Sequence, residues 1–137
     1  MIDILSSFIR KLNVYSDFRK DLLINPISSD IALKQNEDSV KEALKNLILT
    51  DKGERLFQPN IGSDIRKSLF DNMTPASIKV IEQNVKNTIN NFEPRVTLIS
   101  VDVTPDFDNY KIKIDISFYV RNVQTPVTVS VFLERTR

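Results

Sequence analysis

Three carboxylates, Glu54, Asp64 and Glu93, are the residues of this chain whose chemistry could serve catalysis. Two carboxylates about 5–10 Å apart are sufficient for glycoside hydrolysis, one acting as the acid and the other as nucleophile or base. A sugar-binding cleft is usually lined with aromatic rings, but the chain has no tryptophan and few aromatics outside its apolar stripes. We therefore interpret these carboxylates as capping or ion-paired groups, and we predict no catalytic residue.

The absence of histidine and cysteine excludes most other enzyme chemistry. Without these residues the chain cannot form a Ser–His–Asp or Cys–His arrangement, and it lacks the commonest side chains that bind metals. The two glycines, Gly53 and Gly62, do not have the spacing of a phosphate-binding loop. The sequence therefore predicts no cofactor, no metal and no small-molecule substrate.

Composition also limits the kinds of partner. The chain has 137 residues, a single-domain length, and its formal net charge is +1, which gives no electrostatic attraction to nucleic acid. No apolar run approaches the roughly 20 residues of a membrane-spanning helix. Asp3 interrupts the apolar stretch at the N-terminus, which argues against a secretory signal. We therefore expect neither nucleic acid nor a membrane as a partner.

Glu93 and Arg95 flank Pro94 where a helical pattern gives way to strands. Proline fixes its own φ, and in an extended stretch side chains two residues apart project to the same side. An arginine held in this way can bind a carboxylate or a row of carbonyl groups through two N–H groups. The pattern predicts either a partner-binding site or an internal ion pair that sets the angle between helix and sheet.

Both glycines fall in one connection, together with Pro59. Gly53, Pro59 and Gly62 are predicted to form a structural turn, because glycine supplies positive φ angles and proline stiffens the chain. Leu56 and Phe57 are expected to anchor this turn in the core. Glu54 and Arg55 cannot both point inward from an extended stretch, and Arg55 is predicted to contact a partner.

The elements that position these residues follow from the hydrophobic period. We expect a short helix at residues 2–12 and irregular structure at residues 13–38, apart from a strand at 31–34. Ser39 and Glu42 form a capping box that starts the next helix, which ends near Leu49. Ser63-Asp64 can cap a short helix, and Thr74-Pro75 starts a longer one that Pro94 ends. The inward residues of these helices are predicted to be Val40, Ala43, Leu44, Leu47, Ile48, Ile65, Leu69, Ile78, Ile81, Val85, Ile89 and Phe92.

The period changes from 3.6 to 2 after Pro94. Apolar and polar residues alternate from Tyr110 to Arg121 and again from Val127 to Leu133, which indicates two strands, each with one buried face. The run 96–103 changes phase, which predicts a bulge or burial of both faces, and residues 104–109 are expected to form a turn. The fold class is therefore α+β, with helices packed on one face of a three-stranded antiparallel sheet at the C-terminal end.

The last strand of such a sheet is an edge whose backbone groups lack a second neighbour. Phe132 points away from its apolar face, so this residue and the edge are predicted to bind a partner by strand pairing. The alternative is that a helix or the N-terminal arm covers the edge.

Several segments identify a family by their order. They are Asp30-Ile-Ala, residues 47–62 with Gly53-Glu-Arg, Pro59 and Gly62, then Leu69-Phe70, and Glu93-Pro94-Arg95. In this order they resemble the small wedge subunit of contractile-tail baseplates, which includes the wedge protein of T-even phages and the TssE component of type VI secretion. The resemblance begins near Tyr15. We therefore expect residues 15–137 to form one baseplate-wedge domain, and residues 1–14 to be a helical extension or arm.

The resemblance implies a structural role without catalysis. Such subunits sit on the helical core bundle of each wedge, and their sheet is the template for the first ring of tail sheath. We accordingly expect the partners to be wedge proteins and the sheath protein, with Glu93-Pro94-Arg95 contacting the core bundle. The expected location is the virion tail baseplate, reached from the host cytoplasm during assembly. The alternatives are a type VI secretion or tailocin baseplate component and, in another class, a peptidoglycan-cleaving lysozyme-like enzyme.

Overall fold

The computed structural model describes residues 15–70, 72–106, 108–109, 111–121, 123 and 125–134. These residues form two compact units, one that ends at Ser39 and one that begins at Val40. The helix predicted at residues 2–12 lies outside the described residues, and the division into 1–14 and 15–137 stays a prediction. None of the helices in the described part of the chain has the length and apolar character needed to cross a membrane.

The first unit contains a two-stranded antiparallel hairpin. Strand β1 (Ser16–Phe18) pairs with β2 (Leu33–Gln35), and a single bridge between Ile24 and Ile31 extends the pairing. The strand expected at residues 31–34 overlaps β2, so that expectation was right within a residue or two. Strand β1 was not predicted, because three residues are too few to show a period.

Helix α1 (Glu37–Leu49) begins before the predicted capping box. Asn36 takes a left-handed φ of 51°, and the helix starts directly after it with two acidic residues in its first turn, where the helix dipole favours negative charge. Ser39 is therefore inside the helix, and its hydroxyl is buried without a hydrogen-bond partner among the described residues. The capping box at Ser39 is wrong. Four of the five residues predicted on the inward face of α1, Val40, Leu44, Leu47 and Ile48, are buried, and Ala43 is partly exposed.

Two more helices precede the sheet: α2 (Ile65–Ser68) and α3 (Pro75–Phe92). Thr74 caps α3 as predicted, since its hydroxyl accepts a hydrogen bond of 3.2 Å from the backbone N–H of Ser77. The helix ends at Phe92, ahead of Glu93 and Pro94, also as predicted. The buried residues of α3 are Ile81, Val85, Thr88 and Ile89.

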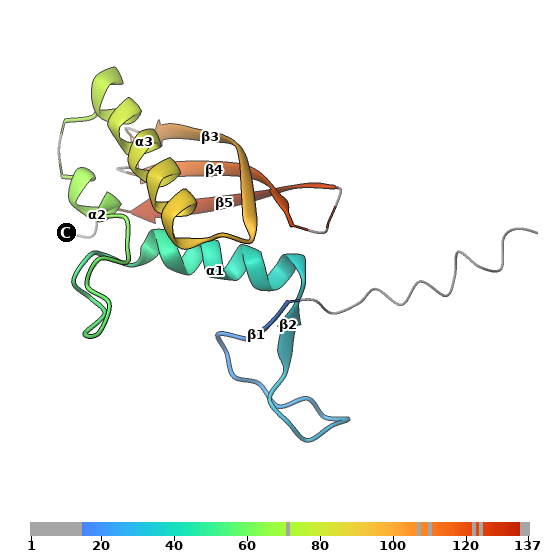
Figure 1. The fold of residues 1–137 in the computed structure, drawn as a ribbon. Helices are drawn as coiled ribbons and strands as arrows, with labels where there is room; N and C mark the ends of the chain where they lie inside the picture. The colour runs from blue at the N-terminus through green and yellow to red at the C-terminus, as the bar shows by residue number, and fades with distance from the viewer. Residues whose placement is uncertain are drawn as a thin grey trace, which may run out of the picture. The chain divides into compact units, whose positions relative to one another are not determined.

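Three antiparallel strands form the C-terminal sheet in the order β3 (Val96–Asp106), β4 (Lys111–Val120) and β5 (Pro126–Glu134). Helix α3 lies across one face of this sheet (Figure 1) and packs against β3. The α+β class, with a three-stranded sheet at the C-terminal end, is thereby confirmed. The buried face of the sheet holds Val101, Ile112, Ile114, Ile116, Phe118, Val120, Val127, Val131 and Leu133.

Strand β3 contains a bulge, the first of the two predicted alternatives. Leu98 lies opposite Phe118, whereas Val101 lies opposite Ile116, so the register shifts between them by one extra residue. This shift moves the core-facing positions from one parity to the other and leaves Ile99 half exposed. The turn expected from residue 104 is shorter than predicted, because β3 continues to Asp106.

Candidate functional site

The junction between α3 and β3 is built around a bidentate ion pair. Nε of Arg95 lies 2.6 Å from Oε1 of Glu93, and Nη2 lies 2.7 Å from Oε2. Glu93 is only 6% exposed, whereas 29% of the Arg95 side chain is accessible. The structure therefore contains the internal ion pair that the sequence left as one alternative, and the same arginine reaches the surface.

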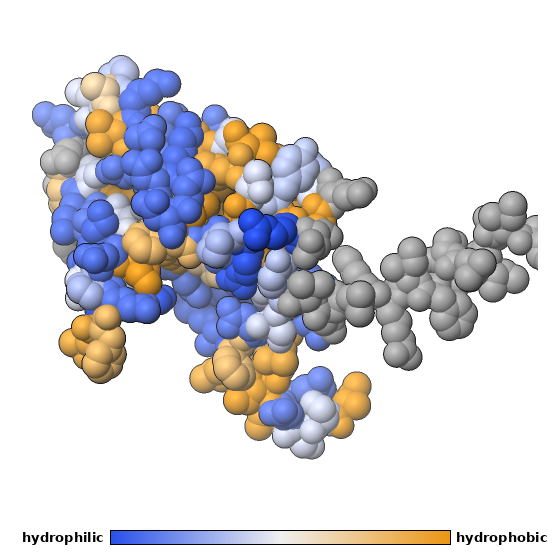
Figure 2. All heavy atoms as spheres, in the orientation of Figure 1, coloured by the Kyte–Doolittle hydropathy of each residue, from blue (hydrophilic) through white to orange (hydrophobic). Residues whose placement is uncertain are grey.

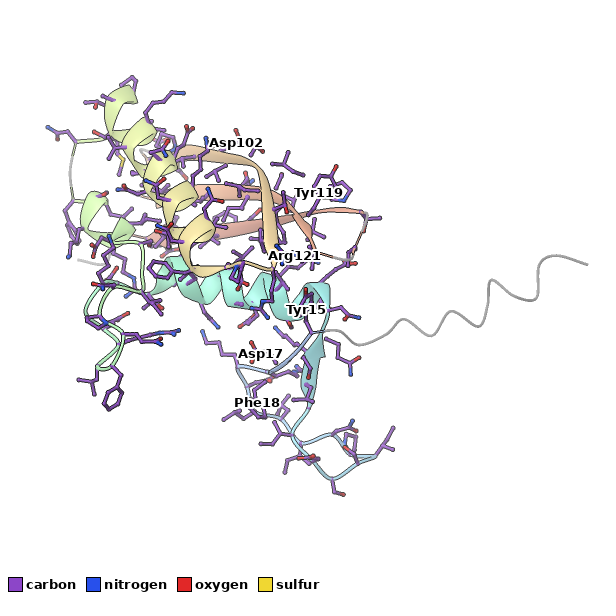
Figure 3. The ribbon with its side chains drawn as sticks, viewed as in Figure 1. Tyr15, Asp17, Phe18, Asp102, Tyr119 and Arg121 are labelled. Atoms are coloured by element: carbon purple, nitrogen blue, oxygen red, sulfur yellow. The ribbon has the colours of Figure 1, made fainter. Side chains whose placement is uncertain are left out.

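The backbone of this junction is hydrogen-bonded on both sides. Glu93 N–H donates to the carbonyl of Ile89 at 2.9 Å, and its own carbonyl accepts from Val96 N–H at 3.3 Å. The carbonyl of Arg95 accepts from Arg121 N–H at 2.8 Å, and Arg121 lies just beyond the end of β4 (Figure 3). These bonds tie the helix end to the sheet, so the exposed part of Arg95 projects from a fixed frame.

The second candidate surface is the edge of the sheet. Strand β5 pairs with β4 on one side, and no other strand in the described ranges pairs with its opposite side. Phe132 is 61% exposed, while its neighbours Val131 and Leu133 are buried. The aromatic ring therefore faces away from the core as expected, beside backbone groups that could pair with another strand.

The connection between α1 and α2 is closed at its neck by backbone hydrogen bonds. Gly53 N–H donates to the carbonyl of Pro59 at 2.8 Å, and Ser63 N–H donates to the carbonyl of Thr50 at 3.0 Å. The buried hydroxyl of Ser63 also donates to the carbonyl of Ile48 at 2.6 Å. The two arms of the loop are thus joined to each other and to the end of α1.

The two glycines of this loop serve different needs. Both have positive φ, +91° at Gly53 and +139° at Gly62. A Cβ at Gly62 would lie 2.6 Å from the carbonyl oxygen of Thr50 and 2.8 Å from the carbonyl carbon of Asp51, whereas one at Gly53 would meet nothing within 4 Å. Gly62 is therefore required by close approach of backbone as well as by its dihedral angle.

Charged groups brace the base of the same loop. Asp64 occupies the N-cap position of the short helix α2, as expected, but it has a left-handed φ of 52° and makes no side-chain cap hydrogen bond. Its carboxylate instead accepts from Lys52 N–H at 3.3 Å and pairs with Nζ of Lys67 at 3.0 Å. The hydrogen bond from Lys67 lowers the pKa of Asp64, so this carboxyl group stays ionised at neutral pH.

The tip of the loop contradicts the expectation that Leu56 and Phe57 anchor it in the core. Leu56 is 90% exposed and Phe57 is 96% exposed. Figure 2 shows an apolar knob below the helices, at the position of this loop in Figure 1. Arg55 and Glu54 are also exposed, and the Glu54 carboxylate turns back to accept from Asp51 N–H at 2.9 Å. The expectation was wrong because two adjacent apolar residues have no period to show which way they face.

The three candidate catalytic carboxylates all have structural bonds. Glu93 is paired with Arg95, Asp64 with Lys67, and Glu54 with a backbone N–H of its own loop. Among the described residues, no group of three or more acidic side chains is placed to hold a metal ion. A glycosidase acid needs a raised pKa, which is the opposite of the shift at Asp64.

Comparison with known proteins gives one family. A family model described as "Baseplate wedge protein gp25" matches residues 34–125. The baseplate wedge protein gp25 of Enterobacteria phage T4 is 34% identical over 107 residues, which is 78% of this chain and 80% of that protein. The family model includes the loop and the α3–β3 junction, but the hairpin up to Leu33 lies outside it.

Solved structures share the fold. A protein described as a tail lysozyme from Geobacter sulfurreducens is 26% identical with a TM-score of 0.70, covering 78% of this chain and 97% of that one. A chain of the anti-feeding prophage baseplate is 22% identical with a TM-score of 0.70, over 80% and 88% of the two chains. A chain of the type VI secretion baseplate complex is 16% identical with a TM-score of 0.57, over 71% and 93%. The last two similarities, below 25% identity, concern the fold alone.

Proposed function

This chain belongs to the family of gp25-type baseplate wedge proteins, and we propose that it docks on the core bundle of a wedge and templates the first ring of tail sheath. The observation that carries the proposal is the 34% identity to the phage T4 wedge protein over 107 residues. A tail baseplate is therefore the expected location, after assembly in the host cytoplasm. Partners are the core-bundle proteins and the sheath protein.

The α3–β3 junction is the proposed contact with the core bundle. Its support is geometric: the guanidinium of Arg95 is oriented by two bonds to a buried carboxylate, and its backbone is bonded to Arg121. A side chain that is already fixed loses little conformational entropy when it binds. Arginine in this state can bind a carboxylate or the carbonyl groups at a helix end.

The sheet edge is the proposed contact with sheath. Strand β5 has nine residues, long enough for a strand of another chain to pair along it. Alternate side chains Thr128, Ser130 and Phe132 lie on the face away from the core, so an added strand would meet one aromatic ring among small polar groups. Backbone pairing supplies affinity in this mode, while the exposed side chains set the register.

Catalysis is the alternative from another class. Its specific support is the Geobacter protein described as a tail lysozyme, at 26% identity. We infer a non-enzymatic chain, because Glu54, Asp64 and Glu93 all have structural partners. A turbidity assay on permeabilised cell walls tests this inference. Lysis that Glu54→Gln or Glu93→Gln abolishes would overturn it.

A tailocin or type VI origin is the alternative within the same class. A chain of the pyocin R2 baseplate and the chain of the type VI secretion baseplate complex are 18% and 16% identical to this chain, against 34% for the phage protein. This difference favours a phage tail. Capsid and terminase genes beside the coding sequence would support a phage origin. Secretion genes beside it, without capsid or terminase genes, would contradict a phage origin.

Reconstitution of the wedge tests the docking proposal. Arg95→Ala should reduce co-purification with the core-bundle proteins of the same machine. The matched control is Arg19→Ala, because Arg19 makes the same bidentate pair with a carboxylate two residues away, Asp21, at 3.0 and 2.7 Å. Equal loss of wedge binding in both variants, or unfolding of the Arg95 variant seen by circular dichroism, would remove the support for docking.

Sheath assembly tests the edge proposal. Ser130→Pro should block polymerisation of sheath on the wedge, because proline has no N–H and disturbs an edge strand. The control is Ser130→Ala, which removes the side-chain hydrogen bond to Asp115 but keeps the backbone N–H. If the two variants support sheath assembly equally, β5 is not the template. If folding and assembly are lost together, the edge proposal loses its support.

A further inference from the structure

The exposed loop tip is a surface that neither the docking site nor the sheet edge explains. It consists of Arg55, Leu56 and Phe57, and it lies beyond the hydrogen bond that joins Gly53 to Pro59. Both apolar side chains are almost fully in water. A leucine and a phenylalanine exposed side by side give up the hydrophobic free energy that burial would supply, so the arrangement calls for a binding role.

We propose that this tip is an anchor that inserts Phe57 and Leu56 into an apolar pocket of another baseplate protein, with Arg55 paired to a carboxylate at the rim of that pocket. The identity of the partner as a baseplate protein rests on the proposed function. The insertion itself rests on the geometry of the loop, and the experiment below separates the two.

The neck holds the tip ready for binding. The Gly53–Pro59 and Ser63–Thr50 backbone bonds close the loop, and the carbonyl of Arg55 accepts from Gln58 N–H at 3.2 Å in a tight turn at the tip. Gly62 lets the two arms approach more closely than any other residue would allow. A loop fixed in this way loses little entropy on docking, so an exposed aromatic at its end can act as a binding hot spot.

Charge indicates the chemistry of the partner. The Glu54 carboxylate is occupied by Asp51 N–H, and Asp51 and Asp64 face Arg66, Lys52 and Lys67 at the base of the loop. Arg55, in contrast, makes no ion pair with any residue that the structure describes. The tip is therefore a cation beside two apolar side chains, which complements a pocket with apolar walls and a carboxylate at its mouth.

A protein pocket fits this tip better than a lipid surface. Membrane anchoring needs a broad apolar face or several basic residues, and the tip offers two apolar side chains and one arginine. The phage T4 relative is a baseplate wedge protein, and the fold recurs in multi-protein baseplates, so protein partners surround proteins of this kind.

Photo-crosslinking from the tip tests the proposal. The full chain carries p-benzoyl-phenylalanine in place of Phe57, in cells that produce the whole contractile machine. The matched control places the same group at Val80, which is 57% exposed on α3. We expect a crosslink from position 57 alone, to a peptide of one other baseplate protein that contains apolar residues and an Asp or Glu.

Charge variants then test the rim. Arg55→Glu should lower the crosslink yield about tenfold, Arg55→Lys should retain most of it, and the charge reversal of the partner carboxylate should restore the yield of Arg55→Glu. The double variant Leu56→Ser, Phe57→Ser should weaken binding to the identified protein by about 30-fold. Its thermal unfolding should match that of the parent, because neither side chain is buried.

Several results would overturn the anchor. One is equal crosslinking from positions 57 and 80, and another is a crosslink only within this chain or to a second copy. A third is co-sedimentation of the chain with phosphatidylglycerol–phosphatidylethanolamine vesicles that depends on Phe57. Failure of the proposed function has a different signature. In that case the tip crosslinks to a pocket as described, but neither protein co-fractionates with assembled tails.

Discussion

The substitution Gly62→Ala probes the neck of the loop in the most direct way. A Cβ at this position would lie 2.6 Å from the carbonyl oxygen of Thr50 and 2.9 Å from the backbone nitrogen of Lys52. The neighbouring atoms all belong to the backbone, so they cannot rotate away as a side chain would. To make room, the chain must separate Ser63 N–H from the carbonyl of Thr50, which are 3.0 Å apart.

The magnitude follows from two contributions. A non-glycine residue at φ +139° carries strain of about 1–2 kcal/mol, and the loss of a hydrogen bond at a buried site adds about 1–2 kcal/mol. Gly62→Ala should therefore destabilise the fold by about 3 kcal/mol. Gly53→Ala is the matched control, because φ is +91° and the space around it is open, so its cost should be about 1 kcal/mol.

Urea unfolding and thermal unfolding, both followed by circular dichroism, measure these changes. The difference of about 2 kcal/mol should appear as a melting temperature about 4–8 °C lower for the Gly62 variant than for the Gly53 variant. Equal destabilisation by the two substitutions would refute the reasoning, because it would show that the dihedral angle alone matters. A stable Gly62 variant would show that the neck can open at no cost.

Three further outcomes are expected. Arg95→Ala should lower the free energy of unfolding by about 2–3 kcal/mol, because it leaves the buried carboxylate of Glu93 unpaired. Adding Glu93→Gln should recover part of that loss in thermal unfolding. Strictly additive effects of the two substitutions would contradict an energetic coupling between Glu93 and Arg95. Ser39→Ala should stabilise the protein by about 1 kcal/mol, because it removes a buried hydroxyl without a partner in the described structure and improves helix propensity; a loss in the urea midpoint would indicate a hidden partner. The hydrogen bond from Lys113 lowers the pKa of Asp115 below 3.8. The contribution of the ionised Asp115 carboxylate to the stability of the protein is therefore complete above the pKa of the unfolded state, and it is lost as the pH falls through the lower pKa of the folded state. An NMR titration that gives Asp115 a pKa at or above 3.8 would contradict this.

The sheet and α3 were predictable because their signals are local and repeated. Every second residue from Ile112 to Val120 is buried, as strict alternation requires, and Thr74-Pro75 marks the start of α3 through a cap that acts within three residues. The bulge in β3 was one of two predicted alternatives, because a phase change in an apolar run indicates either an extra residue in the strand or burial of both faces.

The remaining features depend on geometry that a pattern does not contain. The start of α1 is set by the left-handed φ of Asn36, while the sequence shows only a well-formed capping box three residues later. The direction of Leu56 and Phe57 depends on the neck, which is closed by residues up to thirteen positions apart, Thr50 and Ser63. The pairing of Glu93 with Arg95 could be proposed as an alternative from the sequence, but its burial could not.

The hydrogen bonds that close the neck of the α1–α2 loop also divide it into residues that the fold constrains and residues that it does not. Residues 55–57 lie beyond the Gly53–Pro59 bond. Leu56 and Phe57 bury almost no surface and Arg55 is exposed, so substitutions there change the stability of the domain very little. Glycine at position 62 is fixed by the fold, whereas the side chains of Leu56 and Phe57 are not constrained by packing. If the tip binds as proposed, changes at Leu56 and Phe57 would alter partner preference with little effect on stability, and the tip is a suitable place to graft a foreign recognition sequence onto this scaffold.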